Sequence, residues 1–274
     1  MKAGKAMTQR LLSRAAVLPI GFRLRLLEEL KATTAFEDAD GLRFDLESLT
    51  EYKRAKRRRA QEAPLVRWLA AFGPGDVFFD VGANIGELAL TAARLHGGRV
   101  PVVAFEPAFD TFAALVRNVL ANGLTGAVTP LQVALFDETG VRPFYRSRLG
   151  AGSASHAVSE ALDYARRPFR PAAVEHVLAF RLDDLVRTMG LPRPTRIKLD
   201  VDGVEDRVLA GAVELLASSV REVYTELIDA DAAADRVRTV TAFMGRLGYQ
   251  IAEVAEHRAP GTFPRVADVL FARR

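Results

Sequence analysis

Charged side chains alternate along the segment Ile197–Asp202, where a buried parallel strand would normally be apolar on both faces. In an extended chain Lys198, Asp200 and Asp202 share one face, and the apolar residues between them share the other. Glu226 lies in the next predicted strand, whose end should meet the same edge of the sheet. We predict that Lys198, Asp200 and Glu226, with Asp202 beside them, position an acceptor and move its proton. A divalent cation held by Asp200, Asp202 and Glu226 through oxygen atoms is a second interpretation.

The same residues also have structural interpretations. Lys198 and Asp200 would neutralise each other as an ion pair, without any part in chemistry. Asp202 and Glu205 have a spacing that suits a capping box for the following helix. His156 is an alternative base, although a single loop histidine is more often incidental. The sequence leaves these alternatives open.

A glycine turn follows the apolar run 77–79. Asp80 ends the run, GANIG (82–86) forms the turn, and the apolar periodicity of residues 88–95 predicts a helix. A buried strand, a tight turn and a helix start form the first half of a nucleotide-type βαβ unit. The candidate cofactor-binding residues here are Asp80, Gly82, Ala83, Asn84 and Gly86.

The residue types around this turn favour a cationic adenosine ligand. The turn lacks the G-x-G-x-x-G fingerprint of dinucleotide sites, and Asp80 would repel a pyrophosphate but attract an ammonium or sulfonium group. Glu106, followed by Pro107 at the end of the second predicted strand, is placed to accept from both ribose hydroxyls. S-adenosylmethionine has these groups, and its carboxylate could accept from the helix N-terminus. We predict a site for this cofactor that also includes Ala134.

Two cofactor residues have simpler explanations. Asn84 and Glu87 have the spacing of a capping box, which would serve only the helix start. Glu106 could be an acid favoured by the dipole of the next helix.

Composition limits the class of protein. The chain has 274 residues, 49% hydrophobic and 26% charged, which are ordinary globular values. It has no cysteine, which excludes a disulfide scaffold, a thiolate zinc site and a thiol nucleophile. A net charge of +4 does not by itself indicate nucleic acid. No apolar run approaches the roughly 20 residues of a membrane span, and we expect a soluble cytoplasmic protein.

The chain divides into a leader and one larger domain. Residues 1–62 are expected to form a mainly helical, basic leader, and residues 63–274 an α/β domain. In the domain, strands alternate with helices, and among them we expect a strand at about 128–135 and a helix at about 205–217. This alternation predicts a doubly wound, mostly parallel sheet with its site at the strands' C-terminal ends. The alternation stops at about 141–180, a stretch with a short strand at 142–145 that we interpret as an irregular lid. The candidate substrate-binding residues in this insertion are Ser153, Ser155 and His156.

Five different short motifs are distributed along the chain. They are DVGANIG (80–86), AFEP (104–107), RLDDL (181–185), IKLDVDGVE (197–205) and the Glu226 of YTEL. In this order they resemble the FkbM family of S-adenosylmethionine-dependent methyltransferases. The resemblance implies a seven-stranded class I fold whose last strand is antiparallel, methyl transfer to a hydroxyl of a small molecule or sugar, and S-adenosylhomocysteine as product. Two positions depart from the family pattern: Asp202 stands where a glutamate is usual, and Glu87 where an aromatic residue is common.

Other functions are compatible with parts of the sequence. The basic run 53–59 is either an anion-binding patch or a solvated helix face. An RNA O-methyltransferase using this run is one alternative, although we expect no nucleic-acid partner. A non-catalytic protein that binds S-adenosylmethionine or a partner is another, and the charged strand end argues against it. We also consider the leader a candidate contact for a homo-oligomer.

Overall fold

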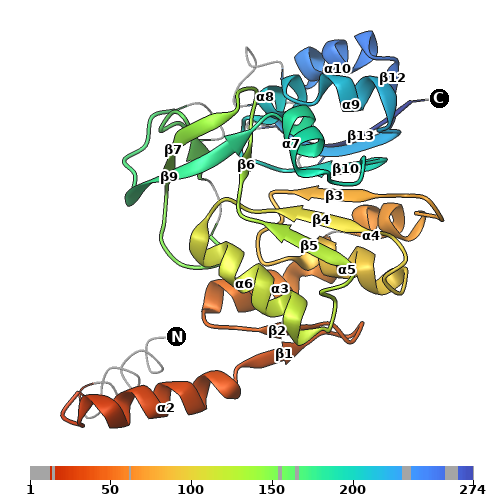
Figure 1. The fold of residues 1–274 in the computed structure, drawn as a ribbon. Helices are drawn as coiled ribbons and strands as arrows, with labels where there is room; N and C mark the ends of the chain where they lie inside the picture. The colour runs from red at the N-terminus through yellow and green to blue at the C-terminus, as the bar shows by residue number, and fades with distance from the viewer. Residues whose placement is uncertain are drawn as a thin grey trace.

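A seven-stranded sheet forms the centre of the computed structural model (Figure 1), which describes residues 13, 16–61, 63–153, 156–163, 167–229, 236–256 and 265–273. The strand order is β12-β13-β11-β10-β3-β4-β5. Neighbours from β11 to β5 are parallel, whereas β13 runs antiparallel to both β11 and β12. The predicted doubly wound fold with an antiparallel last strand is therefore confirmed. The strands are β3 (Phe78–Val81), β4 (Val102–Phe105), β5 (Val128–Leu131), β10 (Arg196–Leu199), β11 (Glu222–Asp229), β12 (Tyr249–Glu256) and β13 (Arg265–Arg273).

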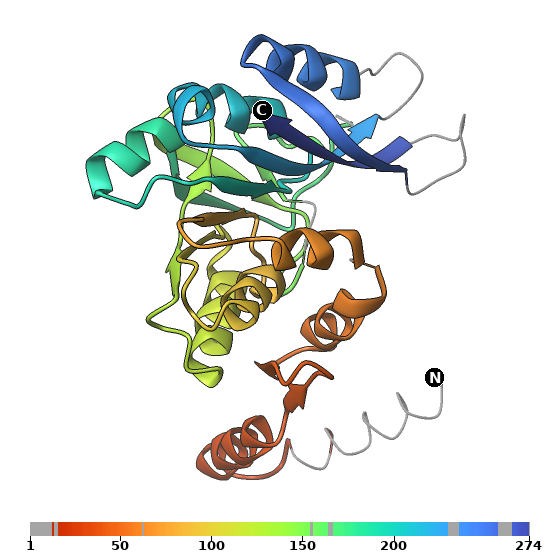
Figure 2. The same cartoon turned by 90° about the vertical axis from the view of Figure 1, so that its right-hand side faces the viewer.

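Both faces of the sheet are covered, because β3 and β4 carry buried apolar side chains on both faces. Phe78 and Phe79 of β3 are fully buried and belong to the two opposite halves of the core. Phe78 packs against Trp68 and Phe72, and Phe79 packs against Phe105. Helices α4 to α6 cover one face and α7 to α10 the other (Figures 1 and 2). The helices are α4 (Ala63–Ala70), α5 (Glu87–Leu95), α6 (Phe109–Ala121), α7 (Leu182–Met189), α8 (Glu205–Ala210), α9 (Val213–Ser218) and α10 (Arg236–Arg246).

The insertion at 141–180 is more regular than the sequence predicts. Strands β7, β8 and β9 lie in it and belong to a second sheet of order β6-β9-β7-β8, in which β7 and β9 pair antiparallel over seven residues each. This sheet stands beside the carboxyl ends of the main strands (Figure 1). The expectation of an irregular stretch was therefore wrong for these paired segments, although the short strand expected at 142–145 is present within β7. Its strands are β6 (Ala134–Leu135), β7 (Gly140–Arg146), β8 (Ala157–Val158) and β9 (Ala173–Phe180).

Two predicted elements are divided in the structure. The strand expected at 128–135 leaves the main sheet after Leu131, and its last part is β6 of the second sheet. The helix expected at 205–217 breaks into α8 and α9 at Gly211. A Cβ atom at Gly211 would lie 2.1 Å from the Phe136 carbonyl oxygen, so the chain bends where another backbone segment approaches closely.

The leader contains a hairpin that the sequence did not reveal. Strands β1 (Ala35–Glu37) and β2 (Arg43–Asp45) pair antiparallel between α2 (Ile20–Ala32) and α3 (Leu49–Gln61). Leu42 and Phe44 of this hairpin are fully buried in the core beside α5 and α6. By contrast, α2 projects from the body of the molecule (Figure 2). Its large apolar side chains are exposed to solvent. The oligomer contact through the leader stays a prediction. None of the helices in the described ranges has the length and apolar character needed to cross a membrane.

Candidate functional site

Two adjoining cavities open at the carboxyl ends of the central strands. The first cavity, of about 210 Å³, is lined by Glu106, Pro107 and Ala134. The second cavity, of about 630 Å³, is lined by Lys198 and Tyr224, among others. The residues that line both cavities form what we call the junction: Arg54, Gly82, Asn84, Asp200 and Glu226.

The glycine turn brings β3 against the end of β10. Gly82 has φ +77°, and a Cβ atom there would lie 1.9 Å from the Asp200 carbonyl oxygen. Only glycine permits both this left-handed backbone and this close approach. The turn therefore places Asp200 directly beside the nucleotide-type loop.

The amide groups of this turn are already used within the protein. Gly82 N and Ala83 N both donate to the Phe105 carbonyl, and Gly86 N donates to the Ala83 carbonyl. Asn84 N donates to Glu106 Oε2, and Ile85 N donates to Asn84 Oδ1. Of the four turn residues predicted to bind the cofactor, Gly82, Ala83 and Asn84 thus shape the cavity walls, whereas Gly86 lines neither cavity.

The capping-box explanation for Asn84 and Glu87 is wrong. Helix α5 begins at Glu87 with Gly86 as its N-cap, and no side chain caps it. The Asn84 amide instead donates to the Ser153 carbonyl oxygen over 3.1 Å. Asn84 therefore connects the glycine turn to the loop between β7 and β8.

Glu106 has the position predicted for a ribose-binding acid. Its two oxygens accept from Asn84 N at 3.0 Å and from Ala108 N at 2.9 Å. Burial raises its pKa to about 7, although both backbone bonds favour the charged form. Since each carboxylate oxygen has two acceptor sites, both oxygens retain capacity for hydroxyl donors from the first cavity. Ala108 precedes α6, so Glu106 also serves the start of that helix, as the alternative proposed.

Asp80 lies behind the turn and lines neither cavity. Its Oδ2 accepts from Ala89 N over 3.1 Å, and its Oδ1 lies 3.8 Å from Lys198 Nζ. Burial raises its pKa to about 6, with Lys198 acting in the opposite direction. Its placement favours a role in orienting α5 and Lys198.

Lys198 connects the ends of β3 and β10. Its Nζ lies 3.2 Å from Asp200 Oδ2 and 3.4 Å from the Gly82 carbonyl oxygen. The structure thus brings together the charged residues that the alternating pattern singled out. The ion-pair interpretation and a role in positioning are both compatible with this geometry.

Glu226 enters the same region from β11. It stands opposite Asp268 of β13 in the sheet register, and Tyr224 donates to Asp268 Oδ2 over 3.3 Å. Burial raises the pKa of Glu226 to about 8, and the nearby carboxylates of Asp200 and Asp268 act in the same direction. A carboxyl group with such a pKa can exchange a proton near neutral pH.

Asp202 lies in a strained backbone conformation beside the first cavity. Its φ is +55°, a value that aspartate adopts more readily than most side chains with a Cβ atom. The capping-box explanation for Asp202 and Glu205 is wrong, because Val204 is the N-cap of α8. Glu205 instead accepts from Gly203 N at 2.9 Å and pairs with Arg236. The alternative of a divalent cation at Asp200, Asp202 and Glu226 also lacks support, since no group of three or more potential ligands forms within the described ranges.

The insertion contributes His156 and Ser153 to the first cavity, whereas Ser155 lies outside the described residues. Ser147 N donates to His156 Nδ1 over 3.2 Å, which leaves the proton of the neutral ring on Nε2. Burial, followed by the charge of Arg146, lowers the pKa of His156 to about 4. His156 is therefore suited to donate a hydrogen bond from Nε2 and unsuited to act as the base.

One site residue, Arg54 of α3, was missed by the sequence reasoning. It belongs to the basic run 53–59, in which Lys53 is exposed while Arg54 turns inward to line both cavities. Its Nε donates to the Gly152 carbonyl over 2.8 Å, and its Nη1 lies 3.9 Å from Glu87 Oε1. No sequence signal separates this arginine from its charged neighbours.

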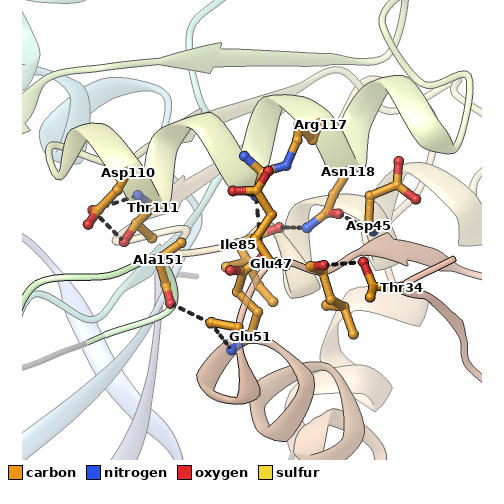
Figure 3. Close-up of polar contacts among 12 residues, drawn as sticks. Thr34, Asp45, Glu47, Glu51, Ile85, Asp110, Thr111, Arg117, Asn118 and Ala151 are labelled. Atoms are coloured by element: carbon orange, nitrogen blue, oxygen red, sulfur yellow. Dashed lines mark hydrogen bonds and ion pairs between the residues drawn. The ribbon is translucent and has the colours of Figure 1, made fainter. Parts of the chain in front are cut away.

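Polar contacts hold α3 against the rest of the site. Figure 3 shows Glu51 of α3 facing Arg117 of α6, while Ala151 of the β7–β8 loop lies beside the start of α3. Asn118 joins three segments: its Oδ1 accepts from Asp45 N at 2.9 Å, and its Nδ2 donates to the Ile85 carbonyl at 2.9 Å. The leader is thus bonded to the helix and the loop that surround the cavities.

A family profile and sequence relatives place this chain in one family. The family profile described as "Methyltransferase FkbM domain" matches residues 80–251. The 31-O-demethyl-FK506 methyltransferase FkbM of Streptomyces tacrolimicus is 34% identical over 219 residues, covering 69% of this chain and 83% of that protein. The hexuronic acid methyltransferase AglP of Haloferax volcanii is 31% identical over 176 residues, covering 64% of this chain and 66% of that protein. Among solved structures, a methyltransferase FkbM from Methylobacillus flagellatus KT aligns with a TM-score of 0.47 at 17% identity, over 72% of this chain and 44% of that chain.

Proposed function

We propose that this chain, which belongs to the FkbM family of methyltransferases, transfers the methyl group of S-adenosylmethionine to a hydroxyl oxygen of a small molecule or sugar. The main support is the junction, where a cavity that suits adenosine meets a second cavity lined by proton-exchanging and positioning side chains. Cofactor and acceptor can therefore meet at one place.

The first cavity suits the adenosine part of the cofactor. Glu106 offers acceptor sites for the two ribose hydroxyls, and Phe105, Pro107 and Ala134 supply apolar walls nearby. His156 offers a donor from Nε2, which has no partner among the described residues. Acceptors for a sugar and a donor beside apolar walls match the chemistry of a nucleoside.

The second cavity suits the acceptor and its proton. In the proposed reaction a lone pair of the acceptor oxygen attacks the methyl carbon in line with the carbon–sulfur bond, which breaks. Its electrons stay on sulfur, so the sulfonium becomes the neutral thioether of S-adenosylhomocysteine. The hydroxyl proton passes to the carboxylate of Glu226, while Lys198 and Asp200 orient the reactants.

The charge of the second cavity favours a neutral acceptor. Four acids line it, Glu87, Asp200, Glu226 and Asp268, against the two cations Arg54 and Lys198. Lys198, the cation that lines this cavity alone, already lies 3.2 Å from Asp200 Oδ2. A further carboxylate would be repelled at this position, so a neutral hydroxyl compound fits better than a uronic acid.

Two experiments test the proposal. Calorimetric titration should give binding of S-adenosylhomocysteine and none of NAD, and the reverse result would refute the assigned cofactor. A transfer assay with labelled methyl groups should then compare neutral sugars, polyketide-like alcohols, uronic acids and RNA. Transfer only to uronic acids or RNA would contradict the proposed acceptor class.

A further inference from the structure

We propose that Arg54, from the N-terminal leader, binds the α-carboxylate of the cofactor and thereby makes α3 part of the cofactor site. This inference rests on the proposed use of S-adenosylmethionine. It assigns a ligand contact to a segment that precedes the family match at residues 80–251.

The position of Arg54 follows from the order of the two cavities. Glu106 lines only the first cavity, and Lys198 lines only the second. If ribose binds at Glu106 and the acceptor binds near Lys198, the sulfonium and the amino-acid part of the cofactor occupy the junction between them. Arg54 is one of the five residues that form this junction.

Arg54 is the cation of the junction within the part of the chain that the structure describes. The other charged residues there, Asp200 and Glu226, are acids that match the ammonium and sulfonium groups. The amides from Gly82 to Gly86 cannot replace Arg54, because each donates to a partner within the protein. The carboxylate of the ligand therefore has its natural partner in the guanidinium group.

The guanidinium is oriented but not saturated. Its Nε is fixed by the 2.8 Å bond to the Gly152 carbonyl, and this bond sets the plane of the group. Among described residues its terminal nitrogens have one charged neighbour, Glu87, at the long distance of 3.9 Å. A planar group held at one nitrogen can accept a carboxylate on the others with little loss of side-chain freedom.

The contact is tested by removing the guanidinium from the protein and the carboxylate from the ligand, separately and together. Binding of S-adenosylhomocysteine and of its decarboxylated analogue, which keeps the ammonium, is measured by calorimetry for the wild type, Arg54→Gln, Arg54→Lys and the control Lys53→Gln. Lys53 carries the same charge one position earlier, but it is exposed. We expect Arg54→Gln to weaken S-adenosylhomocysteine binding about 10- to 100-fold, to leave binding of the decarboxylated analogue unchanged, and Arg54→Lys to recover part of the loss.

The outcomes separate the possible errors. If the wild type binds neither ligand, the proposed function is refuted and the inference with it. If Arg54→Gln weakens both ligands equally, Arg54 acts only by holding the loop at Gly152, and the inference is wrong. If Arg54→Gln leaves both affinities unchanged but raises the KM of the acceptor, the arginine serves the acceptor instead, which also overturns the inference.

Discussion

Replacing Glu226 with glutamine tests the proposed base most directly. The substitution keeps the size of the side chain and removes its ability to take a proton. Because general bases contribute about 10²- to 10⁴-fold to such reactions, we expect kcat to fall by about that factor. Binding of S-adenosylhomocysteine should change much less, since Glu106 and Arg54 provide the other cofactor contacts.

The pH dependence of the wild type follows from the raised pKa of Glu226. A base must be unprotonated, so kcat/KM for the methyl donor should rise with pH around the value of about 8. For a single group of this pKa the ionised fraction grows about tenfold between pH 7 and pH 9. The cationic cofactor should lower this pKa once bound, so the rise in kcat should be centred at lower pH than the rise in kcat/KM.

The same carboxyl group should make the folded protein less stable as pH rises, whereas the activity should rise with pH. Since the folded-state pKa lies above the ordinary value of 4.5, the folded protein binds more protons than the unfolded chain between the two values. Glu226 therefore makes its full contribution to the free energy of unfolding below about pH 4.5, and this contribution declines as pH rises towards about 8. Urea unfolding at pH 5 and pH 9 should show this decline in the wild type and a smaller one in Glu226→Gln.

A labelled-methyl transfer assay across this pH range measures the kinetic effects. Glu214→Gln is the matched control, because Glu214 is exposed on α9 and lines neither cavity. Retention of both the wild-type rate and the wild-type pH profile by Glu226→Gln would refute the assignment of Glu226 as the base.

Three further substitutions test the framework of the site. Gly82→Ala should destabilise the fold by several kcal/mol, because it adds a Cβ clash with Asp200 to the strain of a positive φ. The control Gly123→Ala shares the strain but meets open space, and it should cost only about 1–2 kcal/mol. Equal losses of unfolding free energy in urea would contradict the clash. Glu106→Gln should weaken S-adenosylhomocysteine binding about tenfold or more, since an amide cannot accept at both oxygens, and unchanged calorimetric affinity would argue against ribose binding there. Asn118→Ala should lower the free energy of unfolding by about 2–3 kcal/mol through two lost hydrogen bonds, which denaturant titration can check.

Much of the main sheet could be predicted because most of its strands contain a short apolar run between turn signals. The division of 128–135 could not be predicted in the same way. Both halves of that stretch are extended, and nothing in the period of the side chains marks a change of sheet. The insertion was misjudged for other reasons. The strand signal of β7 is weakened by a proline and two arginines, and β9 alternates in burial but not in residue type, because its exposed positions include the apolar Val174 and Leu178.

The site was predictable where local pattern implies chemistry. Lys198 and Asp200 stood out because a buried strand does not tolerate charges without a purpose, and Glu106 stood out by its place at a strand end. Arg54 could not be found in this way. Its role depends on how α3 lies across the cavities, which is decided by contacts between residues far apart in the sequence.

These contacts also connect part of the N-terminal leader to the methyltransferase domain. Phe44 is fully buried in the main core, and Asn118 bonds both the hairpin at Asp45 and the glycine turn at Ile85 (Figure 3). A displacement of the hairpin would therefore alter packing against α6 and the loop that shapes the first cavity. Because α3, which carries Arg54, begins shortly after this anchored hairpin, the reach of Arg54 into the junction depends on the same buried contacts. The segment from the hairpin to α3 thus acts with the methyltransferase fold, whereas α2 lies outside this set of contacts.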